Sequence, residues 1–173
     1  YIIYNLTGKM ITDLSMASGT LSYDIRKKSW MTDLLDKFDI DETKLPDLMV
    51  IGQVAGTVLP EVADELGLSD QTKVVVGAQD QRCASMGAGI DKGIFTVSLG
   101  TASSISAITD KPLTDDNMQV TCCGLDERYW ILETVVSTAG VALKWLRNTL
   151  FPQLSYAEMD SLAQSAEPLS GGV

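Results

Sequence analysis

The sequence predicts a mixed α/β protein, and three observations support this fold class. Residues 73–76, Lys-Val-Val-Val, form an apolar β-branched run, which is typical of a strand covered on both faces. Two pairs of strand-like segments are separated by short turns, one at Gly100 and one at 125–128. Segments with helical spacing alternate with these strands, and this combination indicates a mixed α/β architecture.

Caps and small residues define the expected elements near the start of the chain. A first helix is expected to end at Gly8, because glycine favours the residue that follows a helix. Segment 12–20, TDLSMASGT, is expected to be a polar turn followed by a small-residue stretch, and a short strand is expected over 20–25. Ser29 is expected to cap a helix whose apolar residues recur at helical spacing as far as Phe38.

Proline and glycine mark the elements in the middle of the chain. A short strand is expected at 50–58. Pro60 stands where a first helical turn accepts proline, and Gly67 stands where that helix is expected to end. The strand at 73–76 leads through Gly-Ala-Gln-Asp into a small-residue helix over 82–88.

Strand pairs and two helices are expected in the second half. An amphipathic helix is expected to open at Ser137 or Thr138. Ser155 and Glu158 have the spacing of a capping box for a last helix over 156–165. The expected strands are 93–99, 102–108, 118–124 and 129–136.

Composition excludes several classes of protein. The net charge is −10, with 13 basic and 23 acidic residues, whereas a nucleic-acid partner requires clustered basic residues. No apolar run approaches the ~18 residues that span a bilayer, so no membrane segment is expected. Cys122 and Cys123 are neighbours on an expected strand and point to opposite faces, which disfavours a disulfide between them. A reducing cytoplasm is therefore the expected location.

The chain contains no histidine. Ser-His-Asp and Cys-His catalysis and histidine-based zinc sites are therefore excluded within it. Proton transfer by this chain falls first to Asp or Glu. The strongest candidate is Asp80, at the carboxyl end of the expected buried strand, where α/β proteins hold ligands. Its alternative role is to cap the helix that follows, and local pattern alone favours capping.

Two further segments are candidates for phosphate binding. Gly100 and Thr101 lie between two expected strands, in a turn whose backbone and hydroxyl suit a phosphate; an ordinary turn is the alternative. The small residues from Ser137 to Gly140 would let a ligand approach the positive end of a helix. Close packing of helix against sheet is the alternative there.

These segments together resemble the FGGY carbohydrate kinases. The similar stretches, in order, are YIIYNLTGKMITDLSMASGTLSYDIRKKSW, GAQDQRCASMGAGI, SLGTASS and VSTAGVALKWLRNTLF. The resemblance implies an actin-like ATPase (ribonuclease H-like) fold and a partial two-domain sugar kinase. Residues 1–90 would end the N-terminal domain and residues 91–173 would start the C-terminal domain.

The resemblance also implies roles for particular residues. Asp80 would be the catalytic base and would bind the sugar together with Gln81. Contacts with ATP would come from four residues: Gly100, Thr101, Gly140 and Lys144. ATP and Mg²⁺ are the implied cofactors, and no residue is assigned to a metal. Three residues of the first block are interpreted as packing and capping residues without a catalytic role: Asp13, Ser15 and Ser18.

The expected reaction is phosphorylation of a sugar by ATP, with D-xylulose as the first choice of sugar. SLGTASS resembles the xylulose kinase branch, since Ser104 stands where the glycerol kinase branch tends to carry an aromatic residue. Gln81-Arg82 departs from the Asp-Asn usual in xylulose kinases, so gluconate, ribulose and glycerol-like polyols stay open. A non-catalytic sugar- or nucleotide-binding module and a purely structural α/β domain are the alternatives, and a homodimer is possible. The chain lacks an initial Met and ends in a loop-like segment, so we expect a fragment that is inactive alone.

Overall fold

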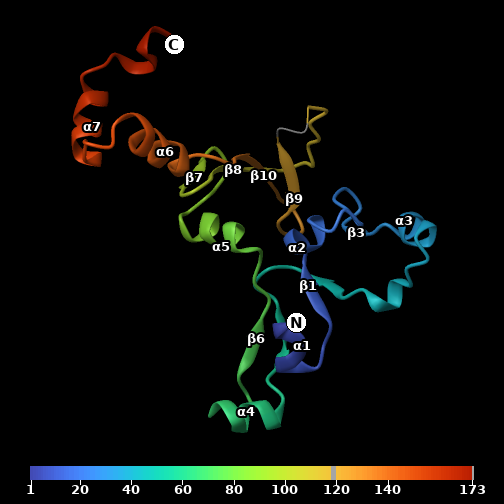
Figure 1. Ribbon diagram of the computed structural model, residues 1–173. Helices are drawn as coiled ribbons and strands as arrows, with labels where there is room; N and C mark the ends of the chain where they lie inside the picture. Colours follow the sequence, from blue (N-terminus) through green and yellow to red (C-terminus); the bar gives the residue numbers. More distant parts are fainter. Residues whose placement is uncertain (118–119, 173) are drawn as a thin grey trace. The chain divides into compact units, whose positions relative to one another are not determined.

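The computed structural model describes residues 1–117 and 120–172 (Figure 1). Contacts between Cα atoms divide the chain into two compact units. Unit 1 comprises Tyr1–Val97 and Ile105–Thr134, and unit 2 comprises Ser98–Ser104 and Val135–Val173. These units are not the two domains expected from the sequence, and the expected domain boundary between residues 90 and 91 stays a prediction. Among the described residues, no helix is both long and apolar enough to cross a membrane.

Unit 1 opens with the helix predicted to end at Gly8. Helix α1 (Ile2–Thr7) does so, and Gly8 has a left-handed φ of 72°. After it, where a polar turn and a small-residue stretch were expected, the chain forms two regular elements: β1 (Ile11–Asp13) runs directly into helix α2 (Leu14–Ser18). Strand β1 pairs in parallel with β4 (Asp47–Met49). Because this partner lies more than thirty residues away, a local pattern does not reveal the strand.

A short hairpin follows α2. Strand β2 (Tyr23–Asp24) lies within the predicted segment 20–25 and pairs with β3 (Ser29–Trp30). Ser29 therefore belongs to a strand, and the prediction that it caps a helix was wrong. Helix α3 (Thr32–Lys37) begins after Met31, which makes no side-chain capping hydrogen bond. A single 3₁₀ turn, η1 (Glu42–Lys44), precedes β4.

The next pair of strands leads toward the candidate base. Strand β5 (Val54–Thr57) pairs antiparallel with β6 (Lys73–Val75), and α4 (Pro60–Leu66) lies between them in sequence. Pro60 occupies the first turn of α4 and Gly67 ends it with a φ of 65°, as predicted. Val75 is 52% exposed, so among the described residues β6 is not covered on both faces.

Strand β6 is followed by α5 (Asp80–Gly87), which begins two residues earlier than predicted (Figure 1). A four-stranded sheet then contains all four strands predicted in the second half, in the order β7-β8-β10-β9. Residues 118 and 119, expected to begin the third of them, lie outside the described residues. The strands are β7 (Thr96–Leu99), β8 (Ser103–Thr109), β9 (Thr121–Gly124) and β10 (Trp130–Val136).

Two helices dominate unit 2. Helix α6 (Gly140–Leu150) begins after Ala139, which makes no side-chain cap, so the prediction of an opening at Ser137 or Thr138 was wrong. Helix α7 (Tyr156–Gln164) begins with the predicted capping box between Ser155 and Glu158. A short 3₁₀ segment, η2 (Pro168–Gly172), follows it.

The core of unit 1 forms around α2 and the β2–β3 hairpin. Its buried centre consists of Leu14, Ala17 and Tyr23, with Trp30 partly buried against them. Segment 125–130 is tied to the same hairpin: the Trp130 indole donates a hydrogen bond to the Ile25 carbonyl at 2.7 Å. The Lys28 ammonium lies 4.0 Å from the centre of the Trp130 ring. These contacts attach the start of β10 to the β2–β3 hairpin.

Candidate functional site

Asp80 is the first residue of α5, directly after the turn that follows β6. The capping position itself is occupied by Gln79, so the interpretation of Asp80 as the N-cap was wrong. The exposed carboxylate accepts two hydrogen bonds through one oxygen, Oδ1. The Gln79 amide donates one at 2.6 Å and the Gln81 backbone N–H donates the other at 2.7 Å. Within the described residues, Oδ2 receives no hydrogen bond, so only one of the two carboxylate oxygens is held by the chain.

The residue before Asp80 is attached to the start of α2. The Gln79 backbone N–H donates to the Ser15 hydroxyl at 3.0 Å. Ser15 in turn donates that hydroxyl proton to the carboxylate of Asp13, which also accepts from the Ser15 backbone N–H at 2.8 Å. Asp13 is thus the N-cap of α2, as the sequence predicted for it. Asp13 and Ser15 are both buried, at 7% and 5% exposed.

A buried ion pair lies one turn further along α5. The Arg82 guanidinium meets the Glu133 carboxylate on β10 through both of its terminal nitrogens, at 2.8 and 3.0 Å. One of these nitrogens also lies 3.6 Å from the Cys123 sulfur on β9. Burial alone would lower the pKa of Arg82, but the hydrogen bonds to Glu133 and Cys123 raise it overall. The pair therefore fixes the helix that begins with Asp80 to the four-stranded sheet.

In unit 2, the turn between β7 and β8 meets the start of α6. The Ala139 N–H donates to the Thr101 carbonyl and the Gly140 N–H donates to the Gly100 carbonyl, each at 2.9 Å. A Cβ at Gly140 would lie 2.6 Å from the Gly100 oxygen. This distance leaves no room for a side chain, so the close packing weighed as an alternative at Gly140 is present. Contact between Gly140 and a nucleotide stays a prediction.

The remaining predicted residues are surface groups. Thr101 and Lys144 are exposed and Gln81 is half-buried. Among the described residues, the hydroxyl of Thr101 and the ammonium of Lys144 make no hydrogen bond. In unit 1, the structure brings Asp80 and Gln81 together at the start of α5. In unit 2, it brings Gly100, Thr101 and Gly140 together at the start of α6.

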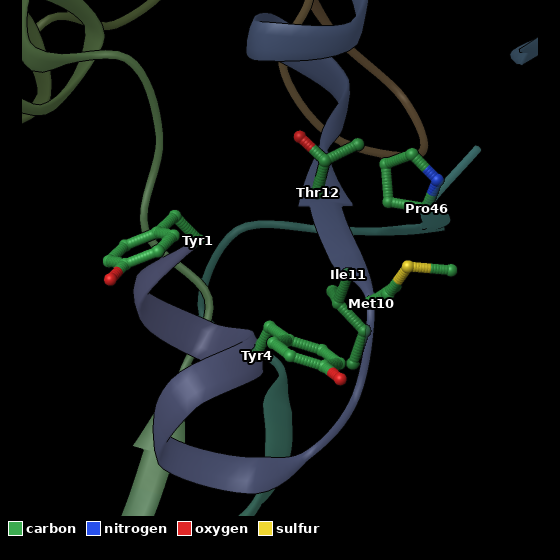
Figure 2. A pocket seen from close by; sticks show the side chains of 6 residues that line it. All are labelled: Tyr1, Tyr4, Met10, Ile11, Thr12 and Pro46. Carbon is green, nitrogen blue, oxygen red and sulfur yellow. The ribbon is translucent and has the colours of Figure 1, made fainter. Parts of the chain in front are cut away.

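A pocket of about 360 Å³ lies elsewhere in unit 1, between α1 and β1 (Figure 2). It contains none of the predicted site residues. Its lining side chains are Tyr1, Tyr4, Met10, Ile11, Thr12 and Pro46. Sequence reasoning also assigned no part in the site to Gln79 and Glu133. No local signal marks their roles, because the contacts join residues 64 and 51 positions apart.

Comparison with known proteins identifies the family. Residues 1–87 match the model of the N-terminal domain of the FGGY family of carbohydrate kinases. The chain belongs to this family, as the sequence motifs predicted, and it has the actin-like ATPase fold of that family.

Three similar proteins carry three different names. Gluconokinase from Bacillus subtilis (strain 168) is 30% identical over 86% of this chain and 29% of its own length. Glycerol kinase from Thermococcus kodakarensis is 34% identical over 99% of this chain and 34% of its own length. The crystal structure of ligand-bound xylulose kinase from Lactobacillus acidophilus superposes with a TM-score of 0.90, at 31% identity, over 99% of this chain and 35% of that one. The chain thus spans about a third of the length of these relatives.

Proposed function

We propose that the intact protein transfers the γ-phosphoryl group of ATP to a hydroxyl of a sugar, with Asp80 as the general base. The observation that carries the proposal is the arrangement of the Asp80 carboxylate at the start of α5. One oxygen accepts from Gln79 and Gln81, and the other accepts no hydrogen bond within the described residues. A carboxylate held in this way is suited to receive a proton from a ligand.

The reaction needs a base because a sugar hydroxyl is a poor nucleophile. In the proposed step, Asp80 accepts the hydroxyl proton while the oxygen forms a bond to the γ-phosphorus. The bond between that phosphorus and the bridging oxygen of ADP breaks, and ADP leaves with the electron pair. General base catalysis of this kind contributes on the order of 10²–10⁴-fold in rate. Alignment of the two substrates and stabilisation of the phosphoryl charge supply most of the rest.

Unit 2 supplies the proposed nucleotide contacts. Gly100 and Thr101 form an exposed turn, and the Thr101 hydroxyl has no partner among the described residues, which suits a phosphate oxygen. Gly140 begins α6 beside this turn, where the positive end of the helix dipole favours an anion. Lys144 lies one turn later on the same helix and is proposed to approach the phosphates.

Mg²⁺ is proposed to bind together with ATP. Magnesium in phosphoryl-transfer sites is bound largely by substrate phosphates and water, and it neutralises developing charge there. The described residues contain no group of three or more side chains suited to hold a metal ion. No residue of this chain is therefore proposed as a metal ligand. A cytoplasmic location and a homodimer belong to the proposal as well.

D-Xylulose is the proposed sugar, with xylulose 5-phosphate as the product. Ser104, at the start of β8 just after the β7–β8 turn, supports this choice, as does the similarity to a solved xylulose kinase. Gluconate, ribulose and glycerol are the competing substrates, since similar proteins include a gluconokinase and a glycerol kinase.

The test is an ADP-release assay on the intact protein with xylulose, ribulose, gluconate and glycerol in parallel. We expect the highest kcat/KM with xylulose. A higher kcat/KM with one of the other three compounds would identify that compound as the substrate and would still support the proposed phosphoryl transfer. Binding of ATP without turnover on any of the four would instead favour a non-catalytic binding module.

A further inference from the structure

We propose that Ser15 is a positioning residue for Asp80: through Gln79 it sets the orientation of the carboxylate that acts as base. This inference rests on the proposed function, because it concerns the orientation of the proposed base. It goes beyond the sequence-based interpretation of Ser15 as a packing and capping residue. Three contacts carry it: from Asp80 to Gln79, from Gln79 to Ser15, and from Ser15 to Asp13.

Gln79 is the residue through which Asp80 is held. Its backbone carbonyl accepts from the N–H groups of Arg82 and Cys83, at 2.9 and 3.0 Å, and so begins α5. Its side-chain amide donates to Asp80 at 2.6 Å. The amide oxygen at the other end of the side chain is buried and has no partner within the described residues. The orientation of this amide therefore depends on where the Gln79 backbone is fixed.

Ser15 supplies that fixed point. Its hydroxyl accepts the Gln79 backbone N–H at 3.0 Å across 64 positions of sequence. A hydroxyl has one proton, and here that proton is donated to the Asp13 carboxylate, so the oxygen lone pairs face Gln79. Asp13 is held in turn by two backbone N–H groups at the start of α2. The donor and acceptor roles along this chain of contacts are therefore fully assigned.

The matched control lies on the same helix. Ser18 also uses its hydroxyl in two directions: it donates to the Leu14 carbonyl at 2.7 Å and accepts from the Gly124 N–H at 3.1 Å. Among the described residues, neither of these partners is hydrogen-bonded to Asp80. Ser15→Ala and Ser18→Ala each remove a hydroxyl group that accepts one long-range backbone hydrogen bond. Only Ser15→Ala removes a hydrogen bond to Gln79, the residue that holds the Asp80 carboxylate.

The experiment measures kcat and KM for ATP and sugar in the intact protein and in the two alanine variants. For Ser15→Ala we expect kcat to fall by about 10–100-fold while each KM changes less than about threefold, since small misplacements of a catalytic group cost up to ~10²-fold. For Ser18→Ala we expect kcat to stay within about threefold of the wild type. Ser15→Thr retains the hydroxyl and should recover most of the lost kcat.

A second measurement does not depend on turnover. Hydrogen exchange at the backbone N–H of Gln79, which donates to Ser15, should be slow in the wild type and in Ser18→Ala. It should be at least tenfold faster in Ser15→Ala. Equal exchange in all three proteins would overturn the inference, as would equal kcat for the two alanine variants. In both cases, sugar-dependent turnover by the wild type would leave the proposed kinase function standing. Absence of turnover in the wild type would instead contradict the proposed function, and the positioning role with it.

Discussion

The buried pair of Arg82 and Glu133 allows one prediction to be worked out in magnitude. The two side chains are 6% and 12% exposed and meet through two short contacts. Glu133→Gln keeps the volume of the side chain and removes its charge, which leaves the guanidinium buried without a counter-ion. Breaking a buried pair costs about 3–5 kcal/mol. Because Glu133 retains some contact with water, we expect the lower end, about 3 kcal/mol, which is roughly a hundredfold in the folding equilibrium.

An exposed pair provides the control for this prediction. Lys92 and Asp110 meet at 2.9 Å with side chains that are 52% and 64% exposed. Pairs of this kind contribute about 0–1 kcal/mol, so Asp110→Asn should be almost neutral. A further variant, Arg82→Met with Glu133→Leu, removes both buried charges. It should recover most of the lost stability, because apolar replacement of a buried pair is often neutral.

Urea unfolding followed by tryptophan fluorescence measures these differences, since Trp130 begins the strand that carries Glu133. The expected order of stability, from highest to lowest, is wild type and Asp110→Asn together, then the double apolar variant, then Glu133→Gln. Two results would refute the reasoning. One is a Glu133→Gln variant no less stable than Asp110→Asn, and the other is a double variant less stable than Glu133→Gln.

Three other substitutions test local features. Burial raises the pKa of Tyr23 to about 12, above its unfolded value of 10.0. The folded form therefore holds the proton more tightly, and the free energy of unfolding falls as pH rises from 10 to 12. Tyr23→Phe should remove this loss of about 2 kcal/mol, as measured by urea unfolding at alkaline pH. Gly140→Ala places a methyl 2.6 Å from the Gly100 oxygen and should cost about 1–3 kcal/mol in thermal unfolding, whereas Gly87→Ala, in open space, should cost nothing. Ser155→Ala removes half of a capping box and should lower stability by about 1 kcal/mol, with faster hydrogen exchange in the first turn of α7.

Features set by neighbouring residues could be predicted from the sequence. Gly8 and Gly67 end helices because each adopts a positive φ that other residues avoid. Pro60 begins a helix for an equally local reason, and the Ser155 capping box closes within four residues. Each of these predictions depends only on the backbone geometry of the residue and its close neighbours in sequence, and the structure confirms all four.

Features that depend on distant partners could not be predicted. Strand β1 is only three residues long and exists through its pairing with β4. Serine is a residue type that often caps helices, but Ser29 lies in a strand because it pairs with Asp24 across the β2–β3 hairpin. Such pairings override weak local preferences, because short elements are stabilised by contacts rather than by propensity.

The same distinction applies to the candidate site. The position of Asp80 between a strand and a helix could be predicted, because the segment Gly-Ala-Gln-Asp carries that signal locally, although α5 begins two residues earlier than predicted. The attachment of Gln79 to Ser15 could not, nor could the pairing of Arg82 with Glu133, because both join distant segments. These contacts attach the residue before Asp80 to α2 and attach α5 to β10.

The central claim is that Asp80 is the base of a sugar kinase, and one comparison tests it most directly. Asp80→Asn and Asp91→Asn each convert an exposed carboxylate that accepts the N–H of the next residue into an amide. Sugar-dependent ADP release by the intact protein should fall by about 10²–10⁴-fold in Asp80→Asn and stay near the wild-type rate in Asp91→Asn. Equal rates for the two variants would contradict the claim and place the base elsewhere.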